Sequence, residues 1–392
     1  MMLTRCNVFF SFICGIILAM TTTALSLQPN RRQMVRQLFS GPLLAPLVAQ
    51  AQTTDATITT AAELSETRIL RVPLRYIPSL SAYVVYYAVG GARFGAILDT
   101  GSPFLNVPAY CNEQKWGCFR PQDSVPSGLA PTYERFDNNQ GWVEWRQAPF
   151  GFVDAEGIIL GRSQYVFGVL SESLLDGPGG VFLGLVRDTE SWIRPSFLGQ
   201  TQVRSFQIDL SEGNQKSLRL TNAEGVVLLN QRETSQSSSS SSSLSTAFNN
   251  DSYIPLVRDL NRRYKDPAYH YTAKALSMRA NGSPVLADSR QPIYVIFDTG
   301  VSGCVVTSEI LEDRYTTARR NREKSLWGSV EVDLLTKSGE VVTLQAEKPL
   351  ATPFGERPWP TFKNAHLIVL GLAFLEGRRM TIDIDEQKLW FD

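Results

Sequence analysis

A short motif that occurs twice, about half the chain apart, constrains this fold more than any other feature. Asp-Thr-Gly stands at residues 99–101 and again at residues 298–300, each time directly after an apolar run. A repeat at this distance predicts two related lobes, each contributing one carboxylate. The apolar run predicts a buried strand that ends at the aspartate, and the glycine lets the backbone turn sharply behind it. The many short runs of β-branched and aromatic residues, with 28 Gly and 21 Pro, predict an all-β chain.

Two aspartates that face one another are suited to acid–base chemistry. Two like charges at close range cannot both ionise, so Asp99 and Asp298 would share one proton. The ionised carboxylate can then deprotonate a water molecule while the protonated one donates to a carbonyl oxygen. We expect this pair to be catalytic. The residues beside it are expected to support the two loops: Thr100, Gly101, Ser102, Thr299, Gly300 and Ser302.

The overall composition argues against other catalytic chemistries. The chain of 392 residues carries 38 basic and 38 acidic side chains, so we expect no nucleic-acid partner. It has two histidines and no HExxH or CxxC spacing, which argues against a zinc site and against a histidine-dependent hydrolase. A phosphate-binding glycine motif is also missing from the sequence. We therefore expect neither a metal nor an organic cofactor.

Residues 68–392 resemble the pepsin-like aspartic endopeptidases. In that family a later apolar-apolar-Gly segment completes each catalytic loop, and residues 181–184 and 368–371 match this pattern in the same order. The resemblance implies an all-β, bilobal fold with the active-site cleft between an N-terminal lobe, residues 68–212, and a C-terminal lobe, residues 213–392. It also implies that the chain hydrolyses internal bonds of a peptide or protein substrate as a monomer.

A function of another class is consistent with the same sequence, because a fold does not fix an activity. A pepsin-fold binding or inhibitor-like protein would keep the architecture with little or no proteolytic activity. The two intact aspartates favour the endopeptidase over this alternative.

Three positions depart from the family pattern. Val301 stands where the family usually carries a hydroxyl or a small residue, which predicts a broader or less acidic pH optimum. Trp145 falls nearest to the tyrosine of the family's flap, and its indole N–H could donate a hydrogen bond as that tyrosine does. Packing against the barrel is the alternative for Trp145. Asn106 replaces a residue that is commonly tryptophan, which predicts a change in packing rather than in chemistry.

The first 67 residues are interpreted as targeting or processing segments. Residues 1–26 combine a basic residue, a short apolar run and small residues, which predicts a secretory signal peptide. A retained anchor is the alternative, although the run is short for a membrane span. Residues 27–67 are either a propeptide or a second, twin-arginine targeting segment. The first reading places the protein in the secretory pathway or outside the cell and the second in the thylakoid lumen of a complex plastid, in both cases without a stable membrane anchor.

Cysteine usage fits a chain outside the cytosol. Cys111 and Cys118 flank a polar loop and suit a hairpin disulfide, and the family resemblance implies a small disulfide loop there too. Cys304 is expected to be a buried small hydrophobe. Residues 231–250, which include seven consecutive serines, predict a solvated loop, and Asn250 and Asn281 begin possible glycosylation sequons.

Overall fold

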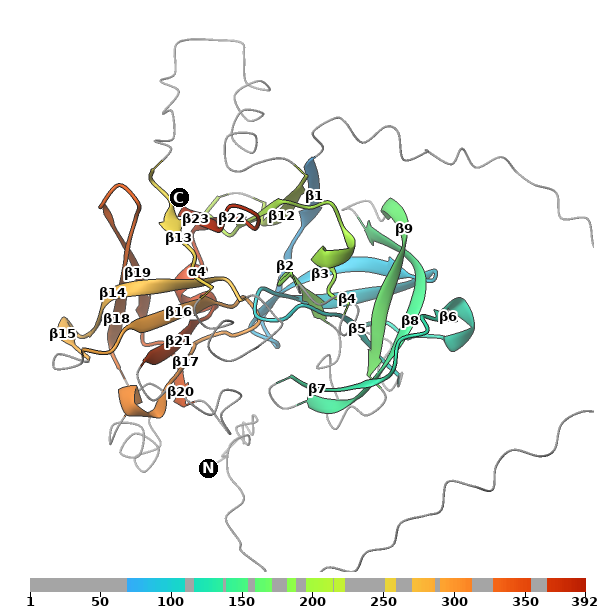
Figure 1. The fold of residues 1–392 in the computed structure, drawn as a ribbon, viewed down its shortest axis with the longest axis horizontal. Helices are drawn as coiled ribbons and strands as arrows, with labels where there is room; N and C mark the ends of the chain where they lie inside the picture. Colours follow the sequence, from blue (N-terminus) through green and yellow to red (C-terminus); the bar gives the residue numbers. More distant parts are fainter. Residues whose placement is uncertain are drawn as a thin grey trace, which may run out of the picture. The chain divides into compact units, whose positions relative to one another are not determined.

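The computed structural model describes residues 69–109, 116–136, 139–153, 159–170, 182–187, 195–213, 215–222, 251–258, 270–285, 290–311, 327–353 and 365–392. The expected signal peptide (1–26), the propeptide or second targeting segment (27–67), Cys111 and the Ser-rich loop (231–250) lie outside these ranges. Within them the chain is mainly β, in agreement with the all-β class expected from the sequence (Figure 1).

The first Asp-Thr-Gly motif belongs to a nine-stranded sheet. Its hydrogen-bonded order is β2 (Arg75–Ile77), β3 (Ala82–Val89), β4 (Ala92–Asp99), β10 (Phe182–Gly184), β5 (Leu105–Pro108), β9 (Ile159–Leu170), β8 (Asn139–Val153) and β6 (Val125–Pro126), with β7 (Thr132–Phe136) paired to β8. The turn between β3 and β4 lies at Gly90 and Gly91, whose φ angles of 57° and 88° are those that glycine adopts most readily.

The second motif belongs to an eight-stranded sheet. Its order is β19 (Val341–Glu347), β18 (Ser329–Leu335), β14 (Thr272–Ala280), β16 (Ile293–Phe297), β21 (His366–Leu370), β17 (Cys304–Val306) and β20 (Ala351–Pro353), with β15 (Ser283–Pro284) paired to β14. A short helix, α4 (Leu372–Leu375), follows β21.

Both sheets repeat one local arrangement around their aspartate. Strand β10 runs parallel to β4 and antiparallel to β5, and β21 likewise runs parallel to β16 and antiparallel to β17. In the first sheet Gly184 lies opposite Asp99, and in the second Leu370 lies opposite Phe297. The two apolar-apolar-Gly segments therefore pair with the strands that lead into the aspartates.

A third, six-stranded sheet combines strands from both halves of the chain. Its order is β1 (Ile69–Pro73), β12 (Ser217–Thr221), β11 (Ser205–Asp209), β22 (Arg379–Asp383), β23 (Lys388–Phe391) and β13 (Ile254–Pro255). The central pairing of β11 with β22 places Phe206 opposite Ile382. The halves of the chain are thus joined by backbone hydrogen bonds and not by packing alone.

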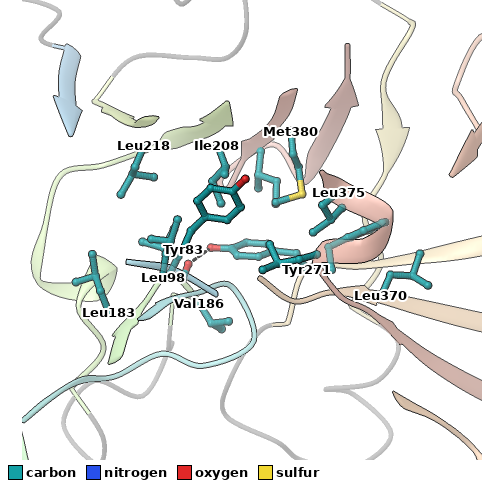
Figure 2. Packing of buried hydrophobic residues seen from close by; sticks show 14 of the residues in the cluster. Tyr83, Leu98, Leu183, Val186, Ile208, Leu218, Tyr271, Leu370, Leu375 and Met380 are labelled. Atoms are coloured by element: carbon teal, nitrogen blue, oxygen red, sulfur yellow. Dashed lines mark hydrogen bonds between the residues drawn. The ribbon is translucent and has the colours of Figure 1, made fainter. Parts of the chain in front are cut away.

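One continuous apolar cluster links the three sheets. Figure 2 shows part of it, with Leu98 and Leu183 from the nine-stranded sheet, Ile208 and Met380 from the six-stranded sheet, and Leu370 from the eight-stranded sheet. Burial of this apolar surface is the main term that favours the folded state.

Candidate active site

The backbone on both sides of each aspartate is fixed by strand pairing. The carbonyl oxygen of Asp99 accepts a hydrogen bond from Leu185 N at 2.8 Å. In the second sheet, Asp298 N donates to Leu370 O at 2.9 Å. Each aspartate is therefore presented from the end of a strand that has neighbours on both sides, which is a rigid position for a functional group.

The glycine of each motif holds its own aspartate. Gly101 N donates to Asp99 Oδ1 at 2.7 Å, and Gly300 N donates to Asp298 Oδ1 at 2.8 Å. A backbone N–H aimed at a carboxylate orients it and stabilises its ionised form. The two loops make the same contact at equivalent positions.

The threonines tie the two loops to each other through four hydrogen bonds. Thr100 N donates to Thr299 Oγ1 at 3.2 Å, and Thr299 N donates to Thr100 Oγ1 at 3.0 Å. The hydroxyl of Thr100 donates to Phe297 O at 2.8 Å, and that of Thr299 donates to Leu98 O at 2.6 Å. Both side chains are fully buried. Each hydroxyl accepts one bond and donates another, so the interaction holds the loops in a symmetric arrangement.

Each carboxylate lies over the glycine of the opposite loop. A Cβ atom added to Gly300 would lie 2.9 Å from Asp99 Oδ1, and one added to Gly101 would overlap the carboxylate of Asp298. Asp99 is 8 % exposed, Asp298 is half-buried and Gly300 is exposed. The structure thus brings the two aspartates together at a place that solvent can reach.

The serines of the two loops contribute less than expected. Ser102 Oγ is buried and makes no hydrogen bond within the part of the chain that the structure describes. Ser302 is exposed, and its backbone carbonyl accepts from Ala373 N at 3.0 Å. Val301 is half-buried and packs against the cluster around Tyr294. The cross-loop hydroxyl bonds come from the threonines.

The structure places Trp145 inside the fold. It lies on β8 with 1 % of its surface exposed and packs on Phe104, with ring centroids 5.8 Å apart. Its indole N–H donates to Thr132 Oγ1 at 3.1 Å, across the β7–β8 hairpin. This geometry favours the packing interpretation over a flap residue that faces a substrate. The equally buried Asn106, opposite Gly168 on β9, has neither side-chain polar atom hydrogen-bonded within the described ranges.

The remaining predicted residues are the cysteines and a possible glycosylation site. Cys118 is described but Cys111 is not, so their disulfide stays a prediction. Cys304 is a free, buried cysteine, and burial raises its pKa to about 12, in agreement with the expected small hydrophobe. Asn281 occupies an exposed turn with φ of 50°.

Tyr271 was not among the residues expected at the site, but it makes hydrogen bonds to the backbone next to both aspartate-bearing segments. Its hydroxyl donates to Leu185 O at 2.5 Å, and its own carbonyl accepts from Phe297 N at 3.4 Å. The sequence offers only a weak signal for this role: Tyr271 directly precedes β14, the strand that pairs with β16.

Comparison with protein-family models and with curated protein sequences finds no match to the chain. Across the residues with described positions, no helix is long and apolar enough to cross a membrane. Over the same ranges, no three His, Cys, Asp or Glu side chains are grouped so that they could hold a metal ion.

Proposed function

We propose that this chain is an aspartic endopeptidase of the pepsin-like family that hydrolyses internal peptide bonds with Asp99 and Asp298. One observation carries the proposal: each carboxylate lies over the glycine of the other Asp-Thr-Gly loop. The four buried threonine hydrogen bonds support it, because they hold two equivalent acids in a fixed relation.

The arrangement suits a reaction in which two acids exchange protons with water and an amide. The ionised carboxylate takes a proton from water, and the water oxygen bonds to the carbonyl carbon of the substrate. The protonated carboxyl gives its proton to the carbonyl oxygen, which yields a neutral gem-diol. The C–N bond then breaks as the nitrogen takes a proton from one carboxyl and a gem-diol hydroxyl returns a proton to the other. The pair is left with one proton, as at the start.

The sheet arrangement supports the bilobal form of the proposal. One aspartate follows a strand of the nine-stranded sheet and the other a strand of the eight-stranded sheet. Lobes at residues 68–212 and 213–392 would each contain one of these sheets, with a cleft between them for an extended peptide. Backbone hydrogen bonds to an extended peptide would supply affinity, and side-chain pockets would supply specificity.

The proposed site of action is the secretory pathway or the extracellular space, with the thylakoid lumen of a complex plastid as the alternative. N-terminal sequencing of the mature protein separates them. A start near Leu27 supports secretion with a propeptide, whereas a start near Gln52 supports a second targeting step.

The activity is tested by peptide cleavage and by binding of a pepstatin-type inhibitor to the mature protein. Asp99→Asn and Asp298→Asn should each lower kcat by at least about a hundredfold, because each removes one partner of the proton exchange. The matched control is Asp251→Asn. Asp251 is exposed, and within the described ranges only its backbone carbonyl accepts a hydrogen bond, from Ser338 N. Cleavage that survives both catalytic substitutions would remove the pair from the mechanism. Inhibitor binding without turnover by the unmodified protein would favour the binding-protein alternative.

A further inference from the structure

Tyr271 connects the two aspartate-bearing segments from behind. It lies one residue before β14, opposite Phe297, which precedes Asp298. Its carbonyl accepts from Phe297 N, and its hydroxyl donates to Leu185 O on the other side. The same Leu185 donates through its N–H to Asp99 O at 2.8 Å. A single side chain therefore continues a path of hydrogen bonds from the backbone beside one aspartate to the backbone of the other.

The surroundings of Tyr271 hold it in one position. The residue is 2 % exposed, and its ring packs edge-to-face on Phe206 of the six-stranded sheet, with centroids 5.4 Å apart. Burial raises the pKa of the phenol well above its ordinary value of 10 and outweighs the opposite effect of nearby Arg187, so the hydroxyl stays a donor.

The segment that receives this hydrogen bond is fixed on its far side. Arg187, two residues after Leu185, pairs with Asp385 at 2.6 Å and also donates to Val203 O. Leu185 itself is fully buried. Without the Tyr271 hydroxyl, the carbonyl of Leu185 would lose a donor supplied by the other half of the chain, and the backbone beside Asp99 would lose its tie to the Asp298 side.

We infer that Tyr271 is a positioning residue, which sets the backbone beside Asp99 in register with the strand that carries Asp298; the inference rests on the proposed endopeptidase activity. The threonine bonds join the two loops and the strand ends directly before the aspartates, whereas Tyr271 adds a separate bond to Leu185, directly after β10. Acid–base catalysis by two groups depends on their relative placement, and a displacement of about 1 Å can cost about a hundredfold in rate. The role is therefore expected to appear in kcat.

Tyr83 offers a matched control for Tyr271→Phe. It is a second buried tyrosine, 3 % exposed, and its hydroxyl donates to Glu376 Oε1 at 3.1 Å. Like that of Tyr271, this bond joins distant parts of the chain, here β3 to the residue after α4. Unlike Leu185, Glu376 makes no hydrogen bond to either aspartate-bearing loop within the described ranges. The two substitutions therefore delete the same atom from similar environments.

The experiment measures kcat, KM and thermal unfolding of the unmodified protein, Tyr271→Phe and Tyr83→Phe on one apolar peptide substrate. We expect Tyr271→Phe to lower kcat about tenfold or more with KM within about twofold, while Tyr83→Phe keeps kcat and both lose a similar amount of stability. Equal kcat values in the two variants would overturn the inference. So would a Tyr271→Phe protein that fails to fold beside a folded Tyr83→Phe. If the unmodified protein neither cleaves peptides nor binds a pepstatin-type inhibitor, the proposed function fails and this inference fails with it.

Discussion

At the scale of single residues, the site depends on which atoms are missing as much as on which are present. Gly101 and Gly300 leave the space that the opposite carboxylate fills. Any side chain at these positions would push the acid out of its place even if the backbone kept its conformation. The Asp-Thr-Gly motif therefore combines an acid, a cross-loop hydroxyl and an empty space within three residues.

Gly101→Ala should inactivate the protein without unfolding it. Because the new methyl group would overlap the carboxylate of Asp298, we expect kcat to fall about a hundredfold. Gly300→Ala should have a smaller effect, since its Cβ would lie 2.9 Å from Asp99 Oδ1. The control is Gly339→Ala, at φ of 89° with no neighbour within 4 Å, which should lose some stability and keep kcat. Kinetics and thermal unfolding of all three variants check this. A fully active Gly101→Ala variant would show that the carboxylate of Asp298 does not need to lie over Gly101 for catalysis.

Residue identity could be predicted from the sequence more readily than residue geometry. The paired motif singled out both aspartates and the threonines, because one pattern appears twice. The role of Trp145 was harder to predict, since the sequence pattern of a β hairpin is the same whether its tryptophan faces a substrate or the core. Its burial follows from the alternation along β8, which places Val143 and Trp145 on the inner face and Trp142 and Glu144 outside.

At the scale of elements, the paired strands behind the site were visible in the sequence and their register was not. The apolar-apolar-Gly segments indicated β10 and β21, but only the folded chain shows Gly184 opposite Asp99. Strand β9 spans residues 159–170, although the apolar residues of the sequence fall in two shorter runs at 157–160 and 165–170. The polar residues between these runs interrupt the apolar pattern, while the long partner strand β8 supplies the hydrogen bonds that continue the strand.

The β14–β18–β19 face of the eight-stranded sheet carries a charged network that makes stability depend on pH. Asp333, 5 % exposed, accepts from Ser277 at 2.6 Å, from Thr343 at 2.8 Å and from Arg279. Burial alone would raise the pKa of Asp333, but these hydrogen bonds and the Arg279 charge outweigh it and lower the pKa below the ordinary value of 3.8. The folded protein therefore binds this proton less readily than the unfolded chain does. The stabilisation is fully present above pH 3.8 and is lost as the pH falls through the lowered pKa.

Asp333→Asn should lower the free energy of unfolding by about 1–3 kcal/mol near neutral pH, because it removes a charged acceptor from a buried network. The difference from the unmodified protein should shrink as the pH falls below 3.8, where the native carboxylate also becomes protonated. Urea unfolding at several pH values measures both quantities. Glu331→Gln is the control, since Glu331 meets the same Arg279 but is more exposed. A difference that stayed constant down to strongly acidic pH would contradict the assignment.

At the scale of the whole molecule, the six-stranded sheet makes the relation between the two aspartates a property of the entire chain. Strand β11 pairs with β22, with β12 and β23 on their outer sides, and the same core cluster packs against them. This junction was not evident in the sequence, because pairing between strands so far apart leaves no local pattern. The aspartates follow strands of two different sheets, so their relative placement depends on this junction as well as on the threonine bonds between the loops.

Asp385 provides a charged clamp at this junction. It lies in the turn between β22 and β23 and pairs with Arg187 at 2.6 Å and with Arg204 at 2.8 Å, both of which precede β11. The side chains are about one-third exposed, so each pair is worth less than about 1 kcal/mol. Asp385→Asn should therefore lower the unfolding temperature slightly at low salt. The loss should nearly vanish in 1 M salt, where charges are screened within about 3 Å.

Glu386→Gln is the matched control for Asp385→Asn. Glu386 is the next residue, and its side chain is 53 % exposed and forms an ion pair with Lys388 alone among the residues that the structure describes, at 3.8 Å. The substitution should therefore leave the unfolding temperature unchanged. Arg187 also fixes the segment that bonds to Asp99. Asp385→Asn should therefore lower kcat, because it removes the ion pair that holds Arg187. In 1 M salt, kcat of the unmodified protein should fall towards the value of the variant, since the salt screens the same ion pair. Equal unfolding temperatures and equal kcat for the two variants at low salt would show that backbone pairing in the six-stranded sheet suffices to hold the halves together.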